Sequence, residues 1–178
     1  MYSVGIIGFG RFGRLLGRIL AGDFHVVAYD RSPQDGETGV ELTHLDTVLG
    51  QQTIFIAIPI REFKSVILDI APRLRNDVTV LDVCSVKVYP VSVMVEGLPV
   101  HVGIIATHPL FGPDSISRSD SLRMMMSATR DVHGKYSFWK AYFESKSISV
   151  VQMTPEEHDQ LAARTQGVTH FVGRVLKE

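Results

Sequence analysis

The strongest constraint on the fold of this sequence is a glycine-rich turn near its N-terminus. Residues 8–13 read GFGRFG, which matches the pattern GxGxxG, and they follow the short β-branched run 3–7. Apolar residues at helical spacing come directly afterwards, so the turn is predicted to join a strand to a helix. This context is typical of a dinucleotide-binding unit, in which the pyrophosphate lies on the helix N-terminus.

An acidic residue completes this unit. Asp30 follows the apolar run 25–29 and lies 17 residues after Gly13. A carboxylate at this strand end accepts hydrogen bonds from the adenosine ribose and repels a 2'-phosphate, whereas Arg31 and Ser32 could bind that phosphate. The sequence therefore predicts NAD as the cofactor, with NADP as the alternative. The residues predicted to bind it are Gly8, Gly10, Arg11, Phe12, Gly13, Asp30, Arg31 and Ser32.

Strand and helix patterns alternate along the rest of the chain. Apolar runs predict strands over residues 53–58, 78–83, 101–106, 123–128 and 148–152. Helical spacing predicts helices over residues 40–49, 63–74, 91–95 and 136–143, of which the first is the weakest. Strands that alternate with helices imply right-handed crossovers. The predicted fold class is therefore α/β, with a Rossmann-type, doubly wound, mainly parallel sheet.

The end of the chain predicts a different element. Thr154 and Pro155 are typical of a helix start, with Thr as the N-cap and Pro at the first helical position. We expect a dinucleotide-binding domain over residues 1–153 and, over 154–178, a long helix that begins a helical dimerisation segment. An apolar stripe on this helix predicts burial against either a further C-terminal segment or a second copy of the chain, and the expected assembly is a homodimer. Its members are Leu161, Val168, Val172 and Val175.

Composition and charge exclude several classes of partner. Eighteen Lys and Arg against 19 Asp and Glu give a net charge of -1, which disfavours nucleic acid as a ligand. The longest apolar runs are far shorter than the roughly 20 residues that a membrane helix needs. Cys84 is the only cysteine, which favours a reducing, cytoplasmic location. The histidines show no metal-ligand spacing, so no metal is expected.

Two further polar clusters come after predicted strands, where a sheet of this class binds its ligands. They are residues 82–87, DVCSVK, and residues 107–113, THPLFGP. Together with residues 157–176, which contain the segment Glu157-His158-Asp159, they resemble the prephenate and arogenate dehydrogenase family of tyrosine biosynthesis, and above all its plant-type arogenate branch. The resemblance extends over most of the chain, and these three motifs in this order are far more specific than the glycine turn.

The resemblance implies an activity and a set of site residues. Members of this family move a hydride from a cyclohexadienyl substrate, arogenate or prephenate, to nicotinamide, while the ring loses carbon dioxide and becomes aromatic. His108 corresponds to the catalytic histidine, which accepts the hydroxyl proton. Ser85 corresponds to a serine that binds the same hydroxyl, and Gln166 and His170 lie on the helix that lines the substrate side.

Other interpretations of these residues stay open at this point. Lys87 could contact the cofactor or substrate, or form a surface salt bridge, and His158 and Asp159 could simply favour the helix start. The family continues beyond the last residue of this sequence into a helical domain that supplies further substrate contacts. Two alternative functions stay open. One is a dinucleotide-binding module without turnover, and the other is a dehydrogenase of another small hydroxy acid.

Overall fold

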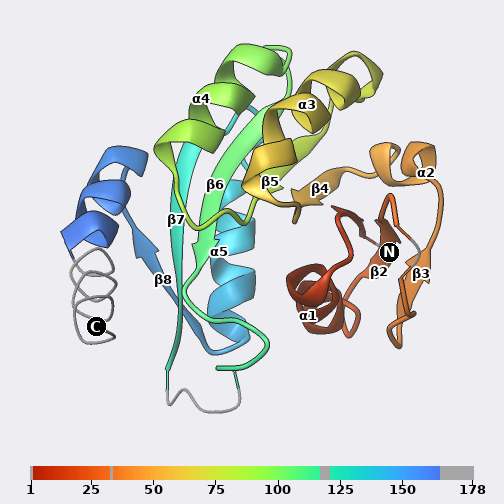
Figure 1. The fold of residues 1–178 in the computed structure, drawn as a ribbon, viewed down its shortest axis with the longest axis horizontal. Coiled ribbons are helices and arrows are strands. Elements are labelled where there is room, and N and C mark those ends of the chain that lie inside the picture. Colours follow the sequence, from red (N-terminus) through yellow and green to blue (C-terminus); the bar gives the residue numbers. More distant parts are fainter. Residues whose placement is uncertain (1, 33, 117–120, 165–178) are drawn as a thin grey trace, which may run out of the picture.

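A computed structural model describes residues 2–32, 34–116 and 121–164 of the chain. Its centre is one sheet of eight strands with helices on both faces (Figure 1). The strands are β1 (Ser3–Ile7), β2 (His25–Tyr29), β3 (Val40–Leu42), β4 (Thr53–Ile56), β5 (Thr79–Asp82), β6 (Gly103–Pro109), β7 (Leu122–Arg130) and β8 (Ile148–Gln152). The helices are α1 (Arg11–Leu20), α2 (Leu45–Leu49), α3 (Ile60–Ile70), the 3-10 turn η1 (Ala71–Arg73), α4 (Val88–Gly97) and α5 (Tyr136–Ser145), and residues 155–164 are also helical.

The strand order confirms the predicted fold class. The order across the sheet is β3-β2-β1-β4-β5-β6-β7-β8, and every pair of neighbours is parallel except β6 and β7. From β1 the chain adds β2 and then β3 on one side. It then returns to form β4 on the other side of β1 and adds the remaining strands in that opposite direction. The strands β1 and β4 therefore flank the topological switch point, where a doubly wound sheet binds its ligand at the carboxyl ends of the strands.

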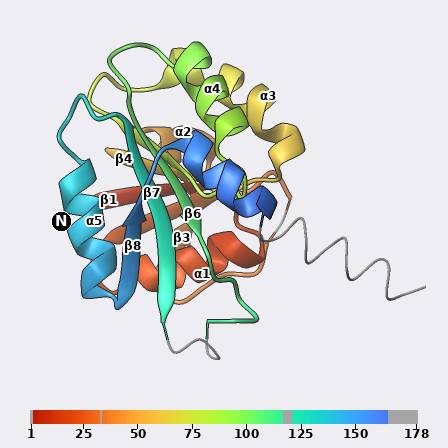
Figure 2. The ribbon, with the colours of Figure 1, turned by 90° about the vertical axis from the view of Figure 1, so that its left-hand side faces the viewer.

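Two apolar cores lie on opposite faces of the sheet. Side chains of α1 and α5, including Leu16, Trp139 and Phe143, pack on one face. Side chains of α2, α3 and α4, including Val48, Phe63 and Met94, pack on the other. Figure 2 shows α3 and α4 on one side of the sheet and α1 and α5 on the other. This three-layer arrangement explains why the central strands β4 and β5 are buried on both faces.

Most predicted elements differ from the observed ones by a few residues at their ends, and two of the differences change the interpretation. The helix expected over residues 40–49 is wrong in its first part, because β3 occupies Val40–Leu42 and only α2 is helical. β3 pairs with β2 at the edge of the sheet. This pairing makes a strand of a segment whose own sequence pattern is ambiguous. The strand expected to stop at residue 106 continues as β6 to Pro109, because His108 and Pro109 pair with Met125 and Met124 of β7. His108 therefore lies on a strand and not in a loop.

The predicted start of the last helix is confirmed. The backbone N–H of Glu157 donates to Oγ1 of Thr154 at 3.1 Å, and the Glu157 carboxylate accepts from the Thr154 N–H at 2.8 Å. This reciprocal pair is a capping box. Gln166, His170 and most of the apolar stripe lie outside the described residues. Within residues 2–32, 34–116 and 121–164, no helix is long and apolar enough to cross a bilayer.

Candidate functional site

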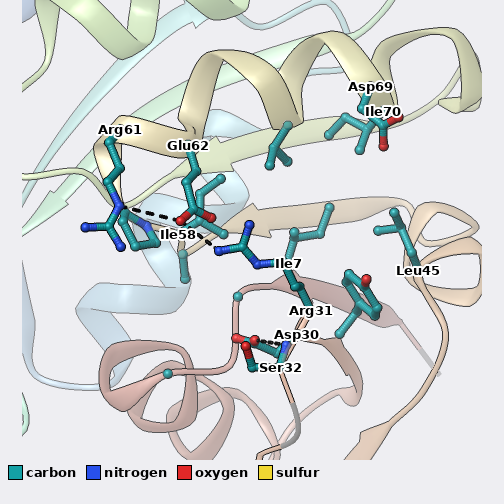
Figure 3. Close-up of a pocket in the computed structure, with 16 residues that line it drawn as sticks. Ile7, Asp30, Arg31, Ser32, Leu45, Ile58, Arg61, Glu62, Asp69 and Ile70 are labelled. Carbon is teal, nitrogen blue, oxygen red and sulfur yellow. Dashed lines mark hydrogen bonds and ion pairs between the residues drawn. The ribbon is translucent and has the colours of Figure 1, made fainter.

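A cleft of about 400 Å³ opens at the switch point between β1 and β4 (Figure 3). Its walls come from the ends of β1 and β2, the segment after β4, the start of α2 and one side of α3 along its length. Five of the eight residues predicted to bind the cofactor line it, and they are Gly8, Gly10, Asp30, Arg31 and Ser32. The cleft therefore lies where the sheet topology predicts a ligand, and its volume suits part of a dinucleotide.

The three glycines of the turn have different surroundings. Gly8 has a φ of +94°, and a β-carbon there would lie 2.4 Å from the carbonyl oxygen of Ala57 on the neighbouring chain segment. A β-carbon on Gly13 would lie 2.1 Å from the carbonyl oxygen of Gly8. A β-carbon on Gly10 would meet no atom within 4 Å. The packing of the chain itself thus requires Gly8 and Gly13, whereas the space beside Gly10 is open to a ligand.

The N-terminus of α1 faces this open space. Gly10 is the N-cap of α1, no side chain caps the helix, and its first turn holds no acidic residue. The first N–H groups of α1 and their partial positive charge are therefore available to an anion. Arg11 is exposed and pairs with Asp114 at 2.5 Å, and Phe12 packs against Phe111 with ring centroids 6.4 Å apart. The side chains of Arg11 and Phe12 thus link the turn to the segment after β6.

Asp30 ends β2 with its carboxylate turned to the glycine turn. One oxygen accepts from the N–H of Phe9 at 2.7 Å, and the other accepts from the N–H of Ser32 at 2.8 Å. The guanidinium of Arg31 reaches toward α3 and pairs with Glu62 at 2.9 Å, as Figure 3 shows. The carboxylate of Asp30 therefore faces the cleft, while the charge of Arg31 is directed to Glu62.

A buried ionic network follows the ends of β5 and β6. Asp82 and Lys87 are fully buried, and the Lys87 ammonium contacts the Asp82 carboxylate and the carbonyl oxygen of Thr107. Asp82 also accepts from the N–H groups of Cys84 and Thr107. Lys87 therefore forms a buried pair and not the surface salt bridge that its sequence context allowed. The network fixes the backbone on either side of the two strand ends.

His108 lies beside this network, next to Thr107. It is 7% exposed, and its Nδ1 atom lies 2.8 Å from Nε2 of His158 in the last helix. Burial, together with the neighbouring His158 and Lys87, lowers the pKa of His108 to about 4. The imidazole is therefore neutral at physiological pH and able to accept a proton.

The loop after β5 holds Ser85 and Cys84. Ser85 is exposed and follows the carboxyl end of β5, and His108 lies near the carboxyl end of the hydrogen-bonded neighbour β6. Burial and the nearby Asp82 raise the pKa of the Cys84 thiol to about 12. The Cys84 thiol is thus protonated at neutral pH, which agrees with its interpretation as a small buried hydrophobe.

Comparison with known proteins adds the family. A family model described as the nucleotide-binding domain of prephenate dehydrogenase matches residues 20–124, more than half of the chain. The chain belongs to the prephenate dehydrogenase family. This membership agrees with the resemblance carried by the three motifs, of which the model covers the first two. The glycine turn itself precedes the matched residues, so its assignment rests on its own geometry.

Individual relatives in the prephenate dehydrogenase family agree with this result. Arogenate dehydrogenase 1, chloroplastic, of Arabidopsis thaliana is 31% identical over 99% of this chain and 30% of that protein. A probable arogenate/prephenate dehydrogenase of Methanocaldococcus jannaschii is 31% identical over 87% of this chain and 37% of that protein. The crystal structure of prephenate dehydrogenase from A. aeolicus with hydroxyphenyl propionate and NAD+ has a TM-score of 0.79 at 21% identity, over 99% of this chain and 68% of that chain. The chain thus spans about a third of the length of the two curated relatives.

Sequence reasoning missed three residues of the site. Glu62 pairs with Arg31 from the first turn of α3, a position that could have been found from Pro59, which precedes α3 as its N-cap. For His158 and Asp159 the sequence left open a role at the helix start, where Thr154 and Glu157 provide the capping hydrogen bonds. Instead, His158 contacts His108 and Asp159 contacts the N-terminus of α4. No local pattern predicts a contact over 50 residues of sequence.

Proposed function

We propose that this chain is the cofactor-binding part of an NAD-dependent enzyme that oxidatively decarboxylates arogenate or prephenate. Membership of the prephenate dehydrogenase family supports the reaction class. The observation that carries the proposal is His108, a buried neutral imidazole at the carboxyl end of β6, in the same sheet as the cleft at the switch point. An imidazole in this state can take the hydroxyl proton that the reaction releases.

The residues around the cleft fit a dinucleotide. The uncapped N-terminus of α1 and the open space beside Gly10 suit a pyrophosphate. Asp30 suits the adenosine ribose and repels a 2'-phosphate, and Arg31 is already paired with Glu62. These contacts favour NAD over NADP. When bound, the nicotinamide would supply the acceptor for the hydride.

The chain's own residues would then position the substrate and remove its proton. His108 would accept the hydroxyl proton, and Ser85 would hydrogen-bond the same hydroxyl from the neighbouring strand end. Gln166 and His170, which lie outside the described residues, are also proposed to contact the substrate. No nucleophile is needed, because the loss of carbon dioxide follows from aromatisation of the ring, so positioning supplies most of the catalysis.

The test is hydride transfer measured by NADH absorbance, with arogenate and prephenate offered separately. His108→Asn is expected to keep the NAD affinity, measured by calorimetry, and to lower kcat by about 10² to 10⁴-fold. Asp30→Ser should narrow or reverse the preference for NAD over NADP. A near-normal kcat in His108→Asn would assign the proton to another group. Tighter binding of NADP than of NAD by the unaltered protein would overturn the cofactor assignment.

A dinucleotide-binding module without turnover is the alternative function. The observation that favours it is the cleft at the switch point, which would bind a dinucleotide whether or not turnover follows. The two functions predict different results in the same assay, since a module binds NAD in the calorimeter but reduces none with either substrate. A dehydrogenase of another small hydroxy acid would instead reduce NAD with that acid alone.

Three further predictions, on domain organisation, oligomeric state and location, accompany this proposal. The dinucleotide-binding domain would comprise residues 1–153, and residues 154–178 would begin a helical segment through which two copies of the chain form a homodimer. Light scattering tests the homodimer, and a monomer at micromolar concentration would refute it. The single free cysteine, Cys84, supports a cytoplasmic location. Cell fractionation tests that location.

A further inference from the structure

Three side chains form a continuous hydrogen-bonded row that ends at His108. Nδ1 of His108 lies 2.8 Å from Nε2 of His158, and Nδ1 of His158 lies 2.8 Å from Oδ1 of Asp159. The two imidazole rings are nearly perpendicular, at 79°, with centroids 5.0 Å apart. His158 is 5% exposed, which shields the row from water.

The carboxylate of Asp159 is held at the N-terminus of α4. It accepts from the N–H of Lys87 at 2.7 Å and from the N–H of Val88 at 2.9 Å. Burial raises the pKa of Asp159, but the bonds from Val88, His158 and Lys87 outweigh it, and the net pKa is below its ordinary value. Asp159 is therefore an ionised carboxylate at neutral pH, with the partial positive end of α4 as its partner.

The nitrogen that carries each proton follows from Asp159, which lies at the end of the row opposite His108. A carboxylate can only accept, so the proton of His158 is on Nδ1. A neutral imidazole carries one N–H, so Nε2 of His158 accepts, and the hydrogen between the two rings belongs to Nδ1 of His108. Nε2 of His108 is then left with a free lone pair. Among the described residues, His158 is the one hydrogen-bond partner of the His108 ring.

We propose that His158 and Asp159 are positioning residues, which hold His108 as its Nδ1–H tautomer and leave Nε2 as the proton acceptor. The tautomer assignment stands on the geometry of the row, and only its consequence for catalysis rests on the proposed function. In that step the substrate O–H bond would break and an Nε2–H bond would form, the O–H electron pair would become the new C=O bond, and the C–H bond on the same carbon would break, its pair leaving with the hydrogen as the hydride for which a bound nicotinamide would supply the acceptor. His108 becomes a cation whose Nδ1–H bond to His158 is strengthened by charge, and Asp159 offsets that charge.

The groups that face His108 determine how the row responds to pH. They are His158 and Asp159 from the last helix and Lys87 from the start of α4. His158 and Lys87 oppose protonation of His108, and the negative charge of Asp159 favours it. Removal of the Asp159 charge should therefore make protonated His108 less stable, and it should lower kcat without a change in NAD affinity.

The tautomer is measured directly by proton–nitrogen NMR of the chain with labelled histidine, and His108→Asn identifies the His108 signals. We expect a protonated Nδ1 and an unprotonated Nε2 on His108 at neutral pH. His158→Gln keeps an acceptor oxygen and should keep this tautomer, whereas His158→Phe removes the acceptor and should abolish the preference. The control His101→Gln changes an exposed histidine and should leave the His108 signals unchanged.

Two results would overturn the proposal. One is a proton on Nε2 of His108 in the unaltered protein, which would mean that His158 is the donor. The other is the same His108 tautomer in His158→Phe as in His158→Gln. If His158→Phe does not fold, the spectra of the unaltered protein and of His158→Gln still decide the assignment.

Turnover separates this proposal from the proposed function. His158→Phe is expected to lower kcat roughly 10²-fold, with unchanged NAD affinity, because the proton acceptor loses its orientation. A normal kcat in that variant refutes the positioning role. Turnover that is absent with both substrates, together with the expected tautomer, refutes the proposed function and leaves the tautomer assignment standing.

Discussion

Two alanine substitutions in the glycine turn should separate the requirements of the fold from those of the ligand. Both add one methyl group, and the two sites are three residues apart. At Gly13 the new β-carbon would lie 2.1 Å from the carbonyl oxygen of Gly8, a backbone atom that cannot rotate away. At Gly10 it would meet no atom within 4 Å. We expect Gly13→Ala to destabilise the protein and Gly10→Ala to weaken dinucleotide binding.

The magnitudes follow from competing terms. Overpacking against backbone costs about 3 kcal/mol, and the better helix propensity of Ala returns about 1 kcal/mol, because Gly13 lies within α1. Gly13→Ala should thus lower the free energy of unfolding by about 2 kcal/mol, or the Tm by roughly 4 to 8 °C. Gly10 is an N-cap, where Ala costs about 0.5 kcal/mol relative to Gly. A methyl in the space proposed for the pyrophosphate should weaken NAD binding by about 5- to 150-fold.

The assays are thermal unfolding without ligand and calorimetry with NAD. Gly10→Ala should unfold within about 2 °C of the unaltered protein, and its NAD affinity should still fall. The reasoning is refuted if both variants lose the same stability, or if Gly10→Ala binds NAD as tightly as the unaltered protein. Either result would mean that the open space beside Gly10 does not receive the ligand.

Two further predictions concern the buried groups near His108. Lys87→Met leaves the fully buried Asp82 carboxylate without its ion-pair partner and should lower the free energy of unfolding, measured in urea, by about 3 to 5 kcal/mol. The double variant that also carries Asp82→Asn should recover part of this loss. The folded-state pKa of His108 is about 4 against an ordinary value of 6.5. Between about pH 6.5 and pH 4 the unfolded chain therefore binds a proton that the folded chain does not, and the free energy of unfolding falls as the pH decreases through this range. At about pH 5 this loss reaches at most about 2 kcal/mol, and the difference between unfolding free energies at about pH 7.5 and pH 5 should shrink by that amount in His108→Asn. An equal pH dependence in the two proteins would show that His108 is not the group responsible.

The sequence alone determined the class of the fold and the location of the cleft. Strand periodicity, the glycine turn and a carboxylate after the second strand are local signals, and the parallel sheet follows from their alternation. The capping box at Thr154 is equally local, because its partners are three residues apart. Where local signals were weak, the prediction failed, as at β3, whose strand state depends on pairing with β2.

Only the tertiary structure decided how the side chains of the site are connected. Lys87 could have been exposed, and its burial beside Asp82 results from the meeting of the β5 and β6 ends. The contact between His108 and His158 joins residues 50 positions apart, so no periodicity or turn signal describes it. A pattern along the chain specifies which face of an element is buried, whereas a proton's location depends on the atoms that folding places within hydrogen-bond distance. The tautomer of His108 is for this reason a property of the folded molecule.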